Sequence, residues 1–378
     1  MTNLARPAIA PEMPGLSAQR SLLIAVIGFL TLVDLFATQA ILPSLAQYYG
    51  VSPAEIGVAA NASTFGMAIA GLLVGVFSAA VERKRAIGLS LLLLAIPTAL
   101  LAFAPNLTVF ATLRVIQGLF MASAFTLTLT HLAERCEFRT AGALAAYVTG
   151  AVASNLIGRL TAAFVAGLVA VALHRNAPEP MLRVGRFWAP WLAHLSDPAL
   201  LRTFAIGFLI LFGFIGVFTY VGFVLMGPPH ALSMTGLGLV FLVFLPSMVT
   251  TPLAGTVTLR AGPAAALSGG LILALAGLIL MLVPNLLALI AGMALVGVGT
   301  FFAQAVATGH VGRIARSDKA AASGLYLSFY YCGGLAGAAV VGQLFDRFGW
   351  PIAIAGVFAA LALAALLGAR LASPVSGR

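Results

Sequence analysis

Residues 21–43 read SLLIAVIGFLTLVDLFATQAILP, a run in which Asp34 is the one charged side chain. A helix of this length spans the hydrocarbon core of a bilayer, which is about 30 Å thick. An ionised carboxylate costs at least about 2.5 kcal/mol at the centre of a bilayer, and acids found there usually have a function. We therefore predict a membrane-spanning helix that carries a functional acid at Asp34.

Similar apolar runs recur along almost the whole chain. Of its 378 residues 61% are hydrophobic and 8% are charged, whereas soluble domains are about 25% charged. We expect further spans at approximately residues 54–81, 86–104, 107–132, 200–226, 234–256, 264–283, 286–309, 321–345 and 351–371. The sequence thus predicts an all-α, polytopic membrane protein.

The short segments between the apolar runs carry most of the 20 Lys and Arg residues. With the N-terminus in the cytoplasm, nearly all of them lie on the cytoplasmic side, as the positive-inside rule requires. The net charge of +10 then reflects membrane topology and not a nucleic-acid partner. We expect a multi-pass monomer in the cytoplasmic (inner) membrane of a bacterium, surrounded by the lipid bilayer, with both termini cytoplasmic.

The two halves of the chain resemble each other weakly. Three elements recur at one constant offset, namely Pro105-Asn106-Leu107 as Pro284-Asn285-Leu286, Gly118 as Gly297 and His131 as His310. Repeats related by an axis along the membrane normal are a known transporter plan, with the substrate bound between them. We predict two pseudo-symmetric bundles on a plan of six helices each, residues 1–173 and 200–378, joined by a cytoplasmic linker at 174–199.

The stretch 141–173 is shorter than its counterpart at 324–371 and lacks the polar turn FDRFGW found there. Arginines before and after the stretch should all be cytoplasmic, which requires an even number of crossings. We expect two abbreviated spans, the fifth and sixth helices, that turn near Arg159. One long kinked helix or a re-entrant pair remain alternatives.

Several motifs carry a resemblance to a known family. The element LRVIQG at 113–118 resembles the fourth-helix RxxQG motif of major facilitator superfamily transporters, and DLFATQAILP at 34–43 resembles a first-helix element of their drug:proton antiporter branch. The segments GVFSAAVERKR at 75–85 and GTVTLRAG at 255–262 resemble the loop signature of that superfamily and its repeat. The resemblance implies gating-loop roles for Gly75, Arg83, Lys84, Arg85, Gly255 and Arg260.

Helix geometry places Asp34 and Arg114 at a similar depth. Asp34 lies nine residues before Pro43, and Arg114 lies seven residues after Leu107. At a rise of 1.5 Å per residue these positions are ~14 Å and ~10 Å below the same membrane face. We expect Asp34 and Arg114 to form a proton-coupling pair, with a purely structural ion pair as the alternative.

Polar and aromatic side chains in the spans are the candidates for substrate contact, because ligand sites combine apolar surfaces with a few polar groups. The candidates are Gln39, Gln117, Phe214, Phe218, Tyr220, Gln304, Tyr330 and Tyr331. The expected spans of the second half contain no acid. Proton coupling is therefore expected in the first half alone.

Sequence motifs for phosphate binding, metal ligation or nucleophilic catalysis do not occur in the chain. We therefore expect neither an enzyme nor a cofactor or metal. We predict a secondary transporter that exports small amphipathic molecules in exchange for protons by alternating access. Uptake of a small anion through Arg114 remains open, as does a non-transporting or decayed carrier, which the shortened 141–173 region would explain.

Overall fold

The structure is a computed structural model that describes residues 38–39, 41–77, 82–135, 189–315 and 318–371. Within these residues the chain is helical, with turns and short loops between the helices. The uninterrupted helices are α2 (Leu42–Tyr49), α3 (Pro53–Phe77), α4 (Arg83–Leu101), α5 (Leu107–Arg135), α8 (Ala189–Leu195), α9 (Pro198–Met226), α13 (Pro263–Leu280), α14 (Leu286–Ile314), α15 (Lys319–Phe348) and α16 (Trp350–Gly368). The predicted all-α fold class is confirmed.

Eight helical stretches among the described residues are long and apolar enough to cross a membrane, as judged by length and composition. They match the expected spans to within a few residues at most ends. The span expected at 86–104 corresponds to α4, whose apolar part, Arg85–Leu101, is shorter than the other eight. The abbreviated region 141–173 and nearly all of the first span, 21–43, lie outside the described residues.

The span expected at 234–256 is a chain of short helices that reaches Ala261. Its parts are α10 (Met234–Val240), η1 (Phe241–Phe244), α11 (Leu245–Thr250), η2 (Thr251–Leu253) and α12 (Ala254–Ala261). Proline has no N–H to donate to the carbonyl four residues earlier, and Pro246 and Pro252 therefore interrupt the α-helical pattern. The tighter 3₁₀ turns η1 and η2 lie next to these prolines.

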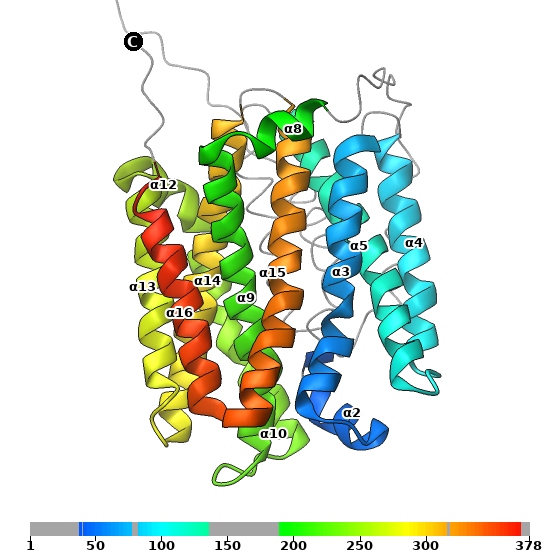
Figure 1. The fold of residues 1–378 in the computed structure, drawn as a ribbon, viewed down its shortest axis with the longest axis vertical. Coiled ribbons are helices and arrows are strands. Elements are labelled where there is room, and N and C mark those ends of the chain that lie inside the picture. The colour runs from blue at the N-terminus through cyan, green and yellow to red at the C-terminus, as the bar shows by residue number, and fades with distance from the viewer. Residues whose placement is uncertain (1–37, 40, 78–81, 136–188, 316–317, 372–378) are drawn as a thin grey trace, which may run out of the picture.

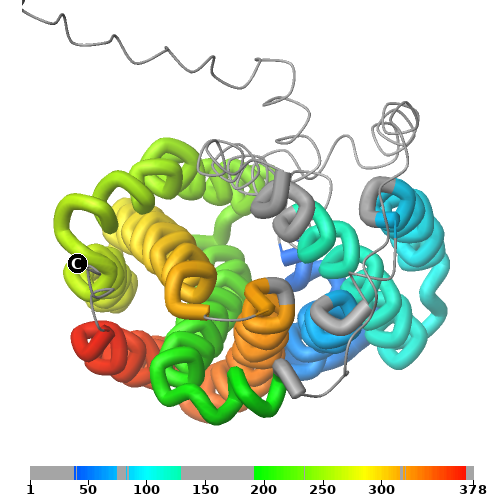
Figure 2. The backbone as a smooth tube through the Cα atoms, turned by 90° about the horizontal axis from the view of Figure 1, so that it is seen from above, coloured from blue at the N-terminus to red at the C-terminus, as the bar shows by residue number. Residues whose placement is uncertain are grey.

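The long helices run side by side, with α15 between α9 and α3 (Figures 1 and 2). The helices α13, α14 and α16 lie on the α9 side of α15, and α4 and α5 lie on the α3 side. The short helices α2 and α10 mark one end of the bundle, called the α2 end below, while α8 and α12 mark the other, called the α8 end. The helix α8 lies within the segment expected to be the linker.

Glycines allow the helices of each half to pack backbone to backbone. A Cβ atom on Gly118 of α5 would collide with the carbonyl oxygen of Ser63 of α3. In the same way, a Cβ atom on Gly333 of α15 would collide with the carbonyl oxygen of Phe208 of α9. Small residues at contacts of this kind are the usual basis of close helix packing in membranes.

The helices α3 and α15 are in contact from one end of the bundle to the other. At the α2 end the backbone N–H of Ala54 donates to Oδ2 of Asp346, at 3.2 Å. Towards the α8 end the hydroxyl of Ser328 donates to the carbonyl of Ala68, at 2.9 Å, and a Cβ on Gly71 would lie 2.8 Å from the Ser328 hydroxyl. The helices α3 and α15 therefore connect the first-half helices to the second-half helices along most of their length.

Candidate functional site

Arg114 is the centre of a polar cluster in the first-half helices. It lies in α5, inside a candidate membrane span, and its side chain is 1% exposed. Its Nε donates to the carbonyl oxygen of Ala60 in α3 at 2.8 Å, and its Nη1 donates to Oε1 of Gln117 at 2.5 Å. The guanidinium is therefore held in a defined orientation between α5 and α3.

Gln117 extends this cluster to α4. Its Nε2 donates to the hydroxyl oxygen of Thr98 at 2.9 Å, and the Thr98 hydroxyl donates to the carbonyl of Leu94 at 2.8 Å. Because an arginine can only donate hydrogen bonds, the carbonyl oxygen of the Gln117 amide must face Arg114. The amide group has a single orientation as a result, so that Arg114, Gln117 and Thr98 form one ordered unit.

The other member of the expected proton-coupling pair, Asp34, lies outside the described residues. Its pairing with Arg114 stays a prediction. A charged side chain within a span is costly unless it is paired or hydrogen-bonded. The burial of Arg114 and its two ordered hydrogen bonds show that this cation has a fixed place in the first-half helices.

Gln39 is a polar side chain that is buried. It is 2% exposed and lies three residues before α2, close to the α2 end of the bundle. Within the part of the chain that the structure describes, neither its Oε1 nor its Nε2 has a hydrogen-bond partner. A buried polar group without a partner costs about 1–3 kcal/mol, and such groups call for a specific explanation. The amide of Gln39 has the capacity to bind a polar ligand group.

A second ordered amide occurs in the second-half helices, at Gln304 of α14. Its Oε1 accepts a hydrogen bond from the hydroxyl of Tyr326 in α15 at 2.8 Å, and its Nε2 donates to the hydroxyl oxygen of Thr308 at 3.3 Å. Tyr326 is not among the predicted site residues. Its position one helical turn before Tyr330 is the signal that could have suggested it.

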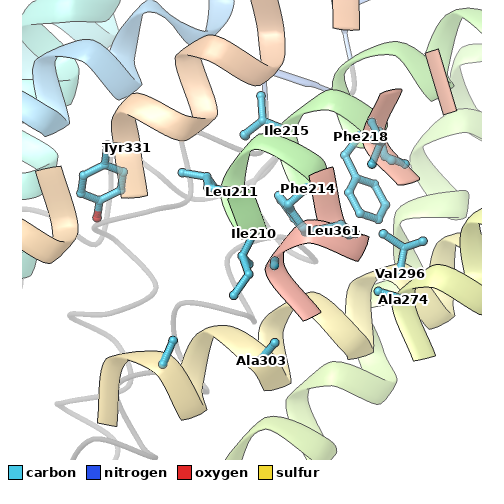
Figure 3. Close-up of a cluster of buried hydrophobic side chains, with 14 of the residues drawn as sticks. Ile210, Leu211, Phe214, Ile215, Phe218, Ala274, Val296, Ala303, Tyr331 and Leu361 are labelled. Carbon is cyan, nitrogen blue, oxygen red and sulfur yellow. The ribbon is translucent and has the colours of Figure 1, made fainter. Parts of the chain in front are cut away.

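Tyr330 and Tyr331 continue this group along α15. The rings of Tyr326 and Tyr330 are stacked, with centroids 6.2 Å apart, and Tyr330 meets Tyr331 edge to face at 5.4 Å. Figure 3 shows Tyr331 on α15, apart from the cluster around Phe214 and Phe218. The structure thus brings together Gln304, Tyr330 and Tyr331 of the predicted substrate residues.

Phe214 and Phe218 lie in a different place, within a buried aromatic cluster. Their rings are 4.7 Å apart, and both pack against Phe244 of η1, while Phe214 also meets Phe301 of α14. Leu361 of α16 closes the same cluster (Figure 3). The contacts made here join α9, η1, α14 and α16, and substrate contact by Phe214 or Phe218 stays a prediction.

Tyr220 is buried between helices from both halves. Its hydroxyl donates to the carbonyl oxygen of Ala338 in α15. Its ring end also occupies the space that a Cβ atom would need on Gly57 of α3 and on Gly342 of α15. Tyr220 therefore fills the junction of α9, α3 and α15, and a role in substrate binding is untested.

The polar contact of Asn61 with Thr219 lies near this junction and was not foreseen from the sequence. The Asn61 amide nitrogen donates to the Thr219 hydroxyl at 3.1 Å and to the carbonyl oxygen of Gly57 at 2.8 Å. Both side chains are buried. A single sequence does not reveal which residues meet across more than 150 positions of the chain, and no local motif marks either residue.

The residues expected in the gating loops are placed only in part. Gly75 lies in the last turn of α3, and Arg83 and Lys84 lie in the first turn of α4, on either side of 78–81, which are outside the described residues. Arg85 is 79% exposed and forms an ion pair with Glu82 at 3.0 Å. On α12, Gly255 has open space around its Cα atom and Arg260 is exposed. A gating role for these residues stays a prediction.

The similarities of this chain to known proteins agree on one family. The sequence profile of the Major Facilitator Superfamily matches residues 24–243. The inner membrane transport protein YnfM of Escherichia coli (strain K12) is 30% identical, over 91% of this chain and 88% of that protein. The uncharacterized MFS-type transporter YybF of Bacillus subtilis (strain 168) is 28% identical, over 90% of this chain and 89% of that protein.

Two further similarities are more limited: one covers a short part of the sequence, and the other concerns the fold alone. The gentisate transporter of Corynebacterium glutamicum is 40% identical over 86 residues, which cover 23% of this chain and 19% of that protein. The crystal structure of the human organic anion transporter MFSD10 (TETRAN) superposes with a TM-score of 0.70 at 18% sequence identity, over 94% of this chain and 100% of that chain. The structural match supports the fold.

Proposed function

Because the chain belongs to the Major Facilitator Superfamily and is a membrane transporter of that type, we propose that it exports small amphipathic molecules in exchange for protons. The two halves, residues 1–173 and 200–378, would alternately open towards the two sides of the bacterial cytoplasmic membrane. The linker at 174–199 and both termini would lie in the cytoplasm. Substrate would bind between the halves, as in other transporters built from parallel repeats.

The observation that carries the proposal is the burial of Arg114 within a span. A buried cation stabilises a nearby carboxylate in its ionised form, and loss of the cation from the vicinity favours the protonated acid. Asp34 belongs to the first expected span, where helix geometry predicts a depth similar to that of Arg114. We assign the proton site to Asp34 and its control to Arg114.

The polar side chains in the spans supply the substrate contacts in this proposal. Gln39 has an amide with free hydrogen-bonding capacity, and Gln117 presents an amide that Arg114 and Thr98 hold in one orientation. On the second-half side, Gln304 and Tyr330 lie together and are partly exposed. An apolar surface with a few fixed polar groups is the usual form of a site for small molecules.

Substitution of Asp34 by asparagine tests the proton site. In everted membrane vesicles energised by a proton gradient, Asp34→Asn should abolish gradient-driven movement of substrate, because the side chain can no longer change its charge. Glu55→Gln is the matched control, since Glu55 is an acid at the exposed N-terminus of α3 where it accepts a hydrogen bond from Ser52. Undiminished gradient-driven transport by Asp34→Asn would refute the proposal.

A second function, uptake of a small organic anion, is favoured by one feature of the Arg114 cluster. Arg114 is a buried cation inside a candidate membrane span, and a fixed positive charge in such a place attracts anions. The local similarity to a gentisate transporter is in keeping with it. This function predicts that Arg114→Gln loses binding of benzoate, used as a probe, whereas Asp34→Asn keeps it.

A further inference from the structure

Tyr326 determines how the amide of Gln304 is presented. Its hydroxyl donates to Oε1 of Gln304 at 2.8 Å, and the amide nitrogen in turn donates to Thr308 at 3.3 Å. A primary amide has two acceptor sites on oxygen and two donor sites on nitrogen. One of each is used within the protein, so that one acceptor and one donor site remain at a fixed orientation.

The ring of Tyr326 is itself held in place. It is 1% exposed and belongs to the buried core between α9, α14 and α15. A Cβ atom on Gly207 of α9 would lie 2.6 Å from the ring, so only glycine leaves room for it there. Phe204 packs against one side, at a centroid distance of 6.4 Å, and Tyr330 stacks at 6.2 Å. The hydroxyl of Tyr326 is therefore a fixed donor.

The arrangement has a counterpart in the first-half helices. There the carbonyl oxygen of the Gln117 amide accepts from Arg114, and its nitrogen donates to the hydroxyl of Thr98. In both halves a buried, rigid donor and a threonine hydroxyl thus fix the amide of a glutamine in a long span. The difference is the donor, which is charged in the first half and neutral in the second.

From this geometry we infer that Tyr326 is a positioning residue, and that Gln304 binds a neutral hydroxyl or carboxamide group on the ring of a planar aromatic substrate. The inference rests on the proposed function and names its substrate class. A group that both donates and accepts matches the two sites left on the Gln304 amide. The ring of Tyr330 is partly exposed and stacks on Tyr326, the donor to that amide, and so provides an aromatic surface next to Tyr326.

The test uses two probes that differ only in this hydrogen-bonding group. Purified full-length protein in lipid nanodiscs is titrated with 7-hydroxycoumarin and with 7-methoxycoumarin, at a pH where the hydroxyl is neutral, and binding is followed by fluorescence anisotropy. We expect the hydroxyl compound to bind about five- to tenfold more tightly, which corresponds to one hydrogen bond of about 1 kcal/mol or slightly more. Equal affinities for the two probes would overturn the inferred substrate class.

Tyr326→Phe keeps the ring and removes the hydroxyl that fixes the amide. We expect this variant to keep its fold and its affinity for the methoxy compound, while its preference for the hydroxyl compound falls to about twofold or less because one bond is disordered. Gln304→Ala should remove the preference altogether. Tyr49→Phe is the control, because it removes a tyrosine hydroxyl that donates to a backbone carbonyl, that of Ala104, outside this cluster.

The outcomes separate the inference from the proposed function. If Gln304→Ala loses the preference and Tyr326→Phe retains it in full, Gln304 contacts the ligand but Tyr326 does not position it. If both variants discriminate as the wild type does, Gln304 is not a binding residue and its place in the proposed substrate site is wrong. Loss of thermal stability without a change in the ratio of affinities would show that Tyr326 serves packing alone.

Discussion

Arg114 and Gln117 form one hydrogen-bonded unit on α5, in which the buried guanidinium orients the amide one turn further along the helix. The unit reaches α3 through the carbonyl of Ala60 and α4 through the hydroxyl of Thr98. A cation placed in this way both orders three helices and supplies the positive charge that the proposed proton site requires.

Arg114→Lys should impair both stability and transport. A lysine is a single flexible ammonium group and cannot reproduce two donors in a rigid fork, and a hydrogen bond to a charged group contributes about 1.5–3 kcal/mol. We expect a lower unfolding temperature of the purified protein and a substrate transport rate reduced by about tenfold or more. Arg347→Lys, at an exposed site on α15, should change neither quantity. Wild-type transport by Arg114→Lys would show that the fork geometry is unimportant.

Gln39→Leu should separate stability from function. The wild-type amide is buried and has no hydrogen-bond partner among the described residues, so an apolar side chain of similar size removes a cost of about 1–3 kcal/mol. We expect an unfolding temperature equal to or above that of the wild type, together with weaker substrate binding. Gln343→Leu on an exposed face of α15 is the control. A Gln39→Leu protein that is destabilised and yet transports normally would contradict this role.

Gly118→Ala should destabilise the first half. The new Cβ would collide with the backbone of Ser63, which cannot move aside as a flexible side chain could, and overpacking of this kind costs about 1–3 kcal/mol. Gly269→Ala in α13 is the matched control, because among the described residues no atom of another helix lies within 4 Å of the position that a Cβ atom would take on Gly269. Thermal unfolding in detergent should show a loss for Gly118→Ala and no loss for Gly269→Ala. Equal stability of the two variants would mean that α3 and α5 are not packed as described.

A cross-link between positions 61 and 219 should stop transport. Asn61 and Thr219 join α3 to α9 by a hydrogen bond of 3.1 Å, and rocking of the two halves requires the first-half and second-half helices to separate at one end. The variant Asn61→Cys/Thr219→Cys is made with Cys136 and Cys332 replaced by serine, and is treated with a short methanethiosulfonate cross-linker. We expect transport to fall on cross-linking and to return on reduction. Full activity of the cross-linked protein would exclude separation at this contact.

The helices could largely be predicted from the sequence, because an apolar run of about 20 residues leaves few choices within a bilayer. The position of Arg114 inside a span could also be predicted, since an arginine inside such a run stands out, while its pairing with Asp34 stays a prediction. The hydrogen bond from Tyr326 to Gln304 could not be predicted, because aromatic side chains in spans are common and only the fold shows which of them meets Gln304. The same holds for Asn61 and Thr219, whose contact depends on the packing of α3 against α9.

Residue type alone does not show which aromatic side chains of the spans line a binding site. Phe214, Phe218 and Tyr330 are all aromatic residues of expected spans. Phe214 and Phe218 lie in the packed cluster with Phe244 and Phe301, whereas Tyr330 stacks on Tyr326, which donates to the amide of Gln304. The interruption of the span at 234–256 had a visible cause in Pro246 and Pro252. Its form, with two 3₁₀ turns, follows from how the chain packs around these prolines.

Proton exchange by Asp34 can be measured as proton movement by the purified protein in liposomes. With 7-hydroxycoumarin as the test substrate and a pH indicator trapped in the lumen, wild-type protein should move protons when substrate is added, and Asp34→Asn should move none while still binding the compound. Substrate-dependent proton movement by Asp34→Asn at the wild-type rate would contradict the account.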